Sequence, residues 1–233
     1  MKALLFDVFG TCVDWRTSVT RAGAELGARL GIADVDWAAL ADAWRARYQP
    51  QLDTVRSGAR PWTNLDVLHR EALDDVLAEL ELADAVAPAE RDGFNRVWHR
   101  LDPWPDTVEG LTRLKRRYMV APVSNGHIAL IVDMARHAGL PWDAVLGAEL
   151  AHAYKPAPEV YLTSVAALGL RPEEATMVAA HNRDLQAAKA LGLGTAFVRR
   201  PTEHGPGQTT DLEPAEDYDH VASDLLDLAQ QLE

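Results

Sequence analysis

Short apolar runs that alternate with helical patterns constrain the fold of this 233-residue chain more than any other feature. The first run, residues 2–8, is short, apolar and bounded by Gly10, as a buried parallel strand is. Similar runs cover 118–124, 175–180 and 194–200, with a weaker fifth candidate at 143–149. Strands that alternate with helices imply right-handed crossovers between parallel strands. The sequence therefore predicts an α/β fold with a parallel sheet that is covered on both faces.

Residues 15–98 interrupt this alternation. Helical patterns follow one another there, at 17–31, 36–49, 65–80 and 88–101, and no strand signal appears between them. Two prolines within 102–107 suit a linker back to the sheet. We therefore expect a helical cap, residues 15–98, inserted into a core made of residues 1–14 and 99–233. The polar stretch 201–220 is expected to be a surface loop rather than part of a site.

Charge and cysteine content narrow the classes of partner. The chain has 23 Lys and Arg against 35 Asp and Glu, a net charge of −12, which disfavours binding to nucleic acid or to an anionic membrane. Its one cysteine, Cys12, excludes an internal disulfide framework and fits a reducing cytoplasm. We interpret Cys12 as a packing residue. No secretory signal and no membrane-spanning apolar run is evident, so we expect a cytoplasmic protein.

Polar side chains follow four of the expected strands. Ligands of open parallel sheets sit beyond the carboxyl ends of the strands, so these side chains are expected to meet at one edge. Each has an ordinary explanation when taken alone, such as a turn, a helix cap or a surface charge. Their coincidence at one edge predicts an active site. The residues are Asp7 and Thr11, Ser124 and Asn125, Lys155, and His181, Arg183 and Asp184.

Four motifs resemble those of the haloacid dehalogenase superfamily of hydrolases. They are FDVFGT (6–11), VSNG (123–126), YKPAPEVY (154–161) and the acid in AAHNRD (179–184). Their order and spacing match over nearly the whole chain, including the helical cap. The resemblance implies a Rossmann-like core with an inserted cap, and a nucleophilic aspartate, here Asp7.

Phe9 separates two kinds of chemistry within that superfamily. Most members resemble phosphatases in which a second acid, two residues after the nucleophile, protonates the leaving group and Mg²⁺ is bound nearby. Phe9 cannot carry a proton, and Asp184 is the one acid in AAHNRD. His181 and Arg183 are poor partners for Mg²⁺, which prefers oxygen ligands. The chain is more similar to the 2-haloacid dehalogenases, which implies that no metal and no cofactor takes part.

The resemblance also implies a role for each site residue. Asp7 attacks carbon, expels halide and forms an ester that water hydrolyses. Lys155 keeps Asp7 ionised. Asp184 orients Lys155 or polarises the hydrolytic water. Thr11 and Ser124 donate hydrogen bonds to Asp7 or to the substrate carboxylate. The remaining expected contacts are Asn125 and the cap residue Arg45 at the halide, Tyr161 near Lys155, and Phe9 at the substrate.

One segment departs from the family pattern. The family's Ser, Asn and aromatic residue before the last acid are replaced by Ala179, His181 and Arg183. We hypothesise that His181 and Arg183 narrow the halide site and add hydrogen-bond donors. Such a site favours a small, hard anion, which makes fluoroacetate a candidate substrate.

Three functions are thus open to the chain. The first is hydrolytic removal of halide from short 2-haloalkanoic acids, which gives 2-hydroxy acids. The second is a Mg²⁺-dependent phosphatase of the same fold that acts on a small metabolite, and the third is a non-catalytic carboxylate-binding protein. The first implies a small halogenated carboxylic acid as partner. The resemblance also allows a homodimer, for which no surface stretch argues by itself.

Overall fold

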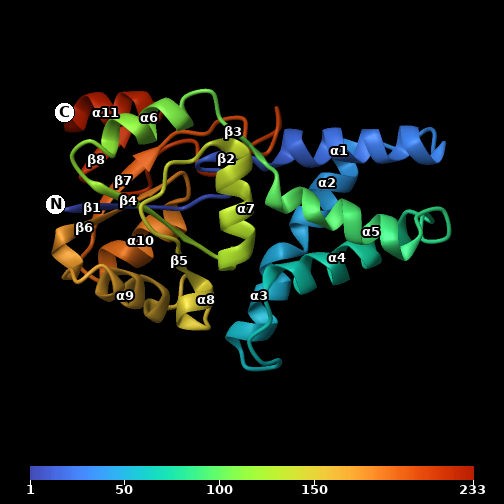
Figure 1. The fold of residues 1–233 in the computed structure, drawn as a ribbon, viewed down its shortest axis with the longest axis horizontal. Helices are drawn as coiled ribbons and strands as arrows, with labels where there is room; N and C mark the ends of the chain where they lie inside the picture. Colours follow the sequence, from blue (N-terminus) through green and yellow to red (C-terminus); the bar gives the residue numbers. More distant parts are fainter.

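Six parallel strands form the central sheet, in the order β5-β4-β1-β6-β7-β8 (Figure 1). The computed structural model describes residues 1–233. All five predicted strands are present, each shorter than its apolar run. The strands are β1 (Ala3–Phe6), β4 (Met119–Ser124), β5 (Leu146–Gly147), β6 (Ala175–Ala179), β7 (Gly194–Val198) and β8 (His220–Ala222).

Both faces of the sheet are covered by helices, which explains why β1 is apolar at every position. Leu4 and Phe6 belong to one apolar cluster, and Ala3 and Leu5 belong to another on the opposite face. The first cluster includes side chains of α6 (Thr107–Leu114), α7 (Ile128–Ala138) and α11 (Leu225–Leu232). The second includes side chains of α9 (Pro158–Ala167) and α10 (Asn182–Ala190). The predicted α/β fold is confirmed, with two short turns of helix besides, α8 (Ala148–Ala151) and η2 (Pro172–Glu174).

The helices of residues 15–99 lie together beside the sheet, at the right of Figure 1. Side chains cap several of them: Asp36 accepts hydrogen bonds from the N–H groups of residues 38 and 39, and Asn64 from that of residue 67. The helices are α1 (Trp15–Leu30), α2 (Trp37–Ala46), α3 (Tyr48–Arg56), α4 (Leu65–Glu79), α5 (Pro88–Asn95) and the 3₁₀ turn η1 (Arg96–His99).

The chain enters and leaves this helical region through two paired segments. β2 (Val13–Asp14) pairs antiparallel with β3 (Asp102–Pro103), so the two connections run side by side. This pairing supports a cap inserted at residues 15–98, and those boundaries remain our proposal.

Two local expectations were wrong. The pattern over 36–49 predicted one helix, but the chain breaks at Arg47 and two helices, α2 and α3, result. The segment 221–232 has a helical pattern in the sequence, but its first residues belong to the strand β8, which pairs with β7 and forms one edge of the sheet. Three residues are too few to show a strand period in the sequence. No helix combines the length and the apolarity that crossing a bilayer requires.

Candidate active site

Asp7 lies just beyond the end of β1, between β4 and β6, where the crossovers leave the sheet in opposite directions. Asp7 is 6% exposed, and its carboxylate receives three side-chain hydrogen bonds. Thr11 Oγ1 donates to Oδ2 at 2.8 Å, and Lys155 Nζ donates to Oδ1 at 2.8 Å. His181 Nδ1 lies 3.0 Å from Oδ2. The structure therefore brings together predicted residues from three separate strand ends.

The charges around Asp7 keep it ionised. Burial alone raises the pKa of the Asp7 carboxyl, but the Lys155 ammonium and the His181 ring outweigh burial and hold that pKa well below its usual range. Burial likewise lowers the pKa of Lys155, and the carboxylates of Asp184 and Asp7 reverse this and raise it. A buried, negatively charged oxygen is therefore available at neutral pH.

Both oxygens of Asp184 are already engaged. Lys155 Nζ donates to Oδ2 at 2.5 Å, and the Tyr161 hydroxyl donates to Oδ1 at 2.5 Å. Burial raises the pKa of Asp184, and the nearby negative charge of Asp7 raises it further. The two carboxyl groups share one ammonium and their pKa values move apart. Of the two roles expected for Asp184, this geometry favours orienting Lys155.

Glu203 corrects the expectation that residues 201–220 lie away from the site. It is 1% exposed, and its Oε2 lies 2.8 Å from His181 Nε2. The Trp15 indole N–H donates to its Oε1 at 3.1 Å. A Cβ at position 10 would collide with this carboxylate, so Gly10, which has a φ of +84°, leaves the necessary space.

His181 is thus held between two carboxylates, those of Asp7 and Glu203. Burial lowers the pKa of the His181 ring, but the negative charge of Glu203 and the hydrogen bond to Asp7 raise it well above its ordinary value. Burial raises the pKa of Glu203, and His181 more than offsets this and lowers it. Both ring nitrogens face acceptors, so the ring is an imidazolium that donates two hydrogen bonds.

A cavity of about 490 Å³ lies above Asp7, lined by residues of both the helical region and the sheet edge. Nine of the eleven predicted site residues line it. Thr11 and Ser124 do not: Thr11 supports Asp7 from below and accepts the Ala180 N–H, and the Ser124 Oγ accepts the Gly126 N–H. The other lining residues are Trp15, Asp42, Ala46, Tyr48, Gln49, Arg56, Pro156 and His204.

Arg45 reaches the cavity from α2 and forms no ion pair. Its guanidinium lies over the Tyr48 ring, 4.1 Å from the centroid, and its buried Nη1 has no hydrogen-bond partner. On the sheet side, Asn125 donates to the Tyr48 hydroxyl at 2.9 Å, and Phe9 packs edge-on against Trp98. Arg183 is exposed and lies at the cavity lining. The cavity therefore offers an unpaired cation to an anion.

Cys12 is not a second nucleophile. It is fully buried, its thiol lies 3.3 Å from the Asp7 carbonyl oxygen, and burial raises its pKa far above the ordinary value. This agrees with its interpretation as a packing residue.

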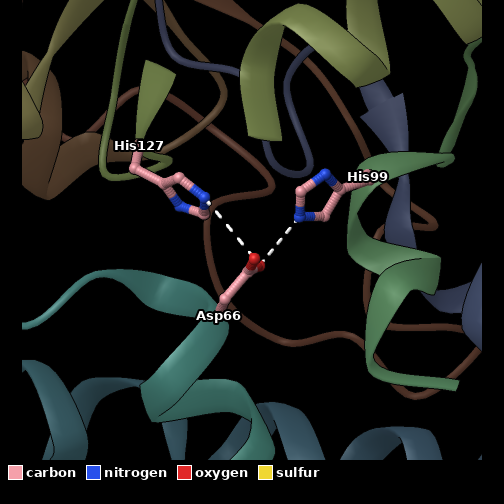
Figure 2. A group of neighbouring side chains, drawn as sticks. All are labelled: Asp66, His99 and His127. Carbon is pink, nitrogen blue, oxygen red and sulfur yellow. Dashed lines mark hydrogen bonds and ion pairs between the residues drawn. The ribbon is translucent and has the colours of Figure 1, made fainter. Parts of the chain in front are cut away.

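A second group of titratable side chains lies apart from the cavity, where α4, η1 and α7 meet (Figure 2). His99 Nε2 lies 2.8 Å from Asp66, and His99 Nδ1 lies 2.8 Å from Asp133. His127 Nε2 is 3.6 Å from Asp66. Two histidines and an aspartate can bind a transition metal, but Arg96 Nη1 already lies 3.0 Å from both Asp66 and His99 Nε2. A cation therefore already neutralises Asp66, and the group joins the helical region to the core.

Comparison with known proteins fits this geometry. The model of the haloacid dehalogenase-like hydrolase family matches residues 1–192. The (S)-2-haloacid dehalogenase 4A of Burkholderia cepacia is 29% identical over 203 residues, which cover 86% of this chain and 84% of that protein.

Two crystal structures resemble the whole chain. A defluorinating L-2-haloacid dehalogenase is 51% identical with a TM-score of 0.97, over 100% of this chain and 95% of that one. Another L-2-haloacid dehalogenase is 50% identical with a TM-score of 0.96, over 100% and 98%. The predicted family is confirmed: the chain belongs to the haloacid dehalogenase-like hydrolases, in the group that contains the L-2-haloacid dehalogenases.

Proposed function

We propose that this protein hydrolyses short 2-haloalkanoic acids to 2-hydroxy acids and halide, through an ester on Asp7. The observation that carries the proposal is the Asp7 carboxylate itself: it is buried, ionised by Lys155 and open to a cavity that contains an unpaired arginine. The similarity to L-2-haloacid dehalogenases supports the same reaction class.

In the first step an Asp7 oxygen attacks the carbon that bears the halogen. The new carbon–oxygen bond forms as the carbon–halogen bond breaks, and the halide leaves with the bonding electron pair. Arg45 and Asn125 line the cavity, and we assign them to the departing halide. Halide is a stable anion, so this step needs hydrogen-bond donors and positive charge but no proton donor. Phe9 at the position of the phosphatase acid is consistent with that requirement.

The substrate is expected to be small. The similar proteins are named for the L or (S) series, so we expect (S)-2-chloropropionate to be used in preference to its (R) enantiomer. Fluoroacetate is a further candidate, because Arg183 brings a donor to the cavity, the His181 ring, whose two nitrogens face Asp7 and Glu203, brings positive charge, and one similar structure is described as defluorinating. A homodimeric state and a cytoplasmic location remain predictions.

The deciding experiment measures halide release from (S)-2-chloropropionate and phosphate release from an aryl phosphate, each with and without EDTA. Halide release that survives EDTA is the expected result. Phosphate release that requires Mg²⁺, without halide release, would show the phosphatase instead. Binding of small carboxylates with neither activity would indicate the non-catalytic carboxylate-binding protein.

A further inference from the structure

His181 has a different environment before and after Asp7 reacts. Before reaction its Nδ1 faces the Asp7 carboxylate at 3.0 Å and its Nε2 faces Glu203 at 2.8 Å. An ester on Asp7 carries no negative charge, so Nδ1 loses its charged partner when the ester forms. Glu203, buried at 1% exposure and fixed by the Trp15 indole, keeps its charge throughout.

The second step of the proposed reaction needs a base. Water must attack the carbonyl carbon of the Asp7 ester, and water is a poor nucleophile until a proton is removed. The base has to lie within hydrogen-bond reach of a water at that carbon. Two groups besides Lys155 contact this end of the cavity, Asp184 and His181.

Asp184 is poorly placed for that task. Its two oxygens accept hydrogen bonds from Lys155 and Tyr161, and it contacts Asp7 only through the Lys155 ammonium. The His181 ring touches Asp7 directly. Its Nε2–H is held by Glu203, as the second nitrogen of a catalytic histidine is held by a carboxylate in many hydrolases.

We propose that His181 is the base that activates the hydrolytic water and that Glu203 is the residue that positions it, an inference that rests on the dehalogenation proposed above. The Nε2 proton stays on the ring and is donated to the Glu203 carboxylate, so Nδ1 is the nitrogen that exchanges protons. Asp184 is left with the task of orienting Lys155.

The protons balance over one turnover. When the ester forms, the His181 Nδ1 proton is released to solvent, which accounts for the one proton that hydrolytic dehalogenation produces. Nδ1 then takes a proton from water while the water oxygen bonds to the ester carbon. Collapse of that intermediate breaks the acyl–oxygen bond, and the departing alkoxide takes the proton back from Nδ1. The product 2-hydroxy acid leaves, and the new Asp7 carboxyl returns its own proton to His181.

Several charged groups set the basicity of His181 in the ester state. Asp7 from β1 becomes neutral, while Glu203 and His204 from the segment after β7 remain, with His204 3.5 Å from Glu203. Arg45 from α2 acts on Glu203 through its charge. Loss of the Asp7 charge removes two of the interactions that raise the pKa of His181, its hydrogen bond to Asp7 and the attraction of that charge, so the ring gives up its Nδ1 proton more readily than in the free enzyme.

The first test is His181→Gln with chloroacetate, followed by rapid quenching. We expect one chloride per enzyme in a burst, and then turnover slowed by roughly 10²–10⁴-fold, the usual contribution of a general base. Mass spectrometry should find a carboxymethyl ester on the Asp7 peptide. The matched control is His137→Gln, an exposed histidine of α7, which should turn over at the wild-type rate without a trapped ester.

The outcomes separate the two proposals. If the wild-type enzyme releases no halide, the proposed function fails. If the wild-type enzyme turns over but His181→Gln either turns over equally fast or fails to form the ester at all, the function stands and the base assignment is wrong.

The second test addresses Glu203 through the pH profile of kcat, which a purely structural role would not move. A base must be neutral to act, so kcat rises with pH through the pKa of His181 in the ester state. Glu203→Gln removes the charge that raises this pKa, so the acid limb of the profile, where kcat rises with pH, should move to lower pH while kcat falls.

Glu203→Asp keeps the charge and should leave the acid limb near its wild-type position. Glu213→Gln, an exposed change in the same segment, is the control. An acid limb that Glu203→Gln leaves in place would overturn the assignment.

Discussion

Lys155 Nζ lies 2.8 Å from Asp7 Oδ1 and forms the only ammonium contact that this buried carboxylate has. The same nitrogen donates to Asp184, so one ammonium serves two buried carboxyl groups. Removing one partner of a buried ion pair costs more than the pair contributes, because the remaining charge is left without compensation.

Lys155→Met is therefore expected to abolish halide release and to lower the free energy of unfolding at pH 7 by about 3–5 kcal/mol. Without the ammonium, the pKa of Asp184, which burial already raises, rises further above its unfolded value, and the pKa of Asp7 rises too, because His181 is then its one charged donor. A raised folded-state pKa favours folding as pH falls, so the variant should recover stability, relative to wild type, on acidification below neutral pH. Urea denaturation at several pH values measures this.

Lys189→Met, which removes a surface lysine paired with Glu216, is the control and should unfold like the wild type. A Lys155 variant whose stability deficit stays constant or grows on acidification would mean that Lys155 does not hold these carboxylates ionised.

Arg45→Lys tests the proposed halide contact. The guanidinium lies over the Tyr48 ring and its buried Nη1 has no hydrogen-bond partner, an arrangement that a lysine ammonium cannot reproduce. We expect kcat/KM for chloroacetate to fall roughly ten- to a hundredfold, the equivalent of about 1.5–3 kcal/mol for a charged hydrogen bond. Product inhibition by chloride should weaken in parallel. Arg29→Lys on the surface of α1 should change neither, and an unchanged chloride inhibition in Arg45→Lys would place the halide elsewhere.

Fluoride release tests the hypothesis drawn from His181 and Arg183. A hard anion gains most from hydrogen-bond donors. We therefore expect the enzyme to release fluoride from fluoroacetate in addition to chloride from chloroacetate, each measured with an ion-selective electrode. Arg183→Ala should lower fluoride release more than chloride release, because fluoride is the poorer leaving group. Chloride release without any fluoride release would show that His181 and Arg183, in place of the family's usual residues, do not adapt the site to fluoride.

His99 links the helical region to the core away from the cavity, through hydrogen bonds to Asp66 on α4 (Figure 2) and to Asp133 on α7. It is 2% exposed, so its loss leaves partners without their donor. His99→Ala should reduce the free energy of unfolding by about 1–3 kcal/mol, as removal of one partner from a buried hydrogen bond does. Urea denaturation measures it, with the exposed His137→Ala as control. Equal free energies of unfolding of the two variants would show that His99 does not stabilise the contact between the helical region and the core.

The sequence was sufficient for the sheet because buried parallel strands leave a continuous apolar run. Residues 2–8, 118–124 and 175–180 were recognised in this way, and the polar residues that follow them proved to be neighbours. β8 was missed, because three residues with a mixed pattern carry no period. The break at Arg47 was missed because both halves of 36–49 have helical composition.

Glu203 follows the same rule as the other site residues, because it lies beyond the carboxyl end of a parallel strand. The strand over 194–200 was predicted, but the residues beyond its carboxyl end were treated as a surface loop because they are polar. Burial of a carboxylate there depends on its partners, Trp15 and His181, which lie 188 and 22 residues away in the sequence. No local pattern encodes such a contact. Searching every strand end, whatever its composition, would have included it.

The most direct test of the account is a single turnover with excess enzyme in H₂¹⁸O. If Asp7 forms the ester and water attacks its carbonyl carbon, the label enters the Asp7 carboxylate and the hydroxyl of the product carries unlabelled oxygen from the enzyme. Mass spectrometry of the Asp7 peptide and of the product reads both. Label in the product hydroxyl with none in Asp7 would mean that water displaces the halide directly, which would contradict the account.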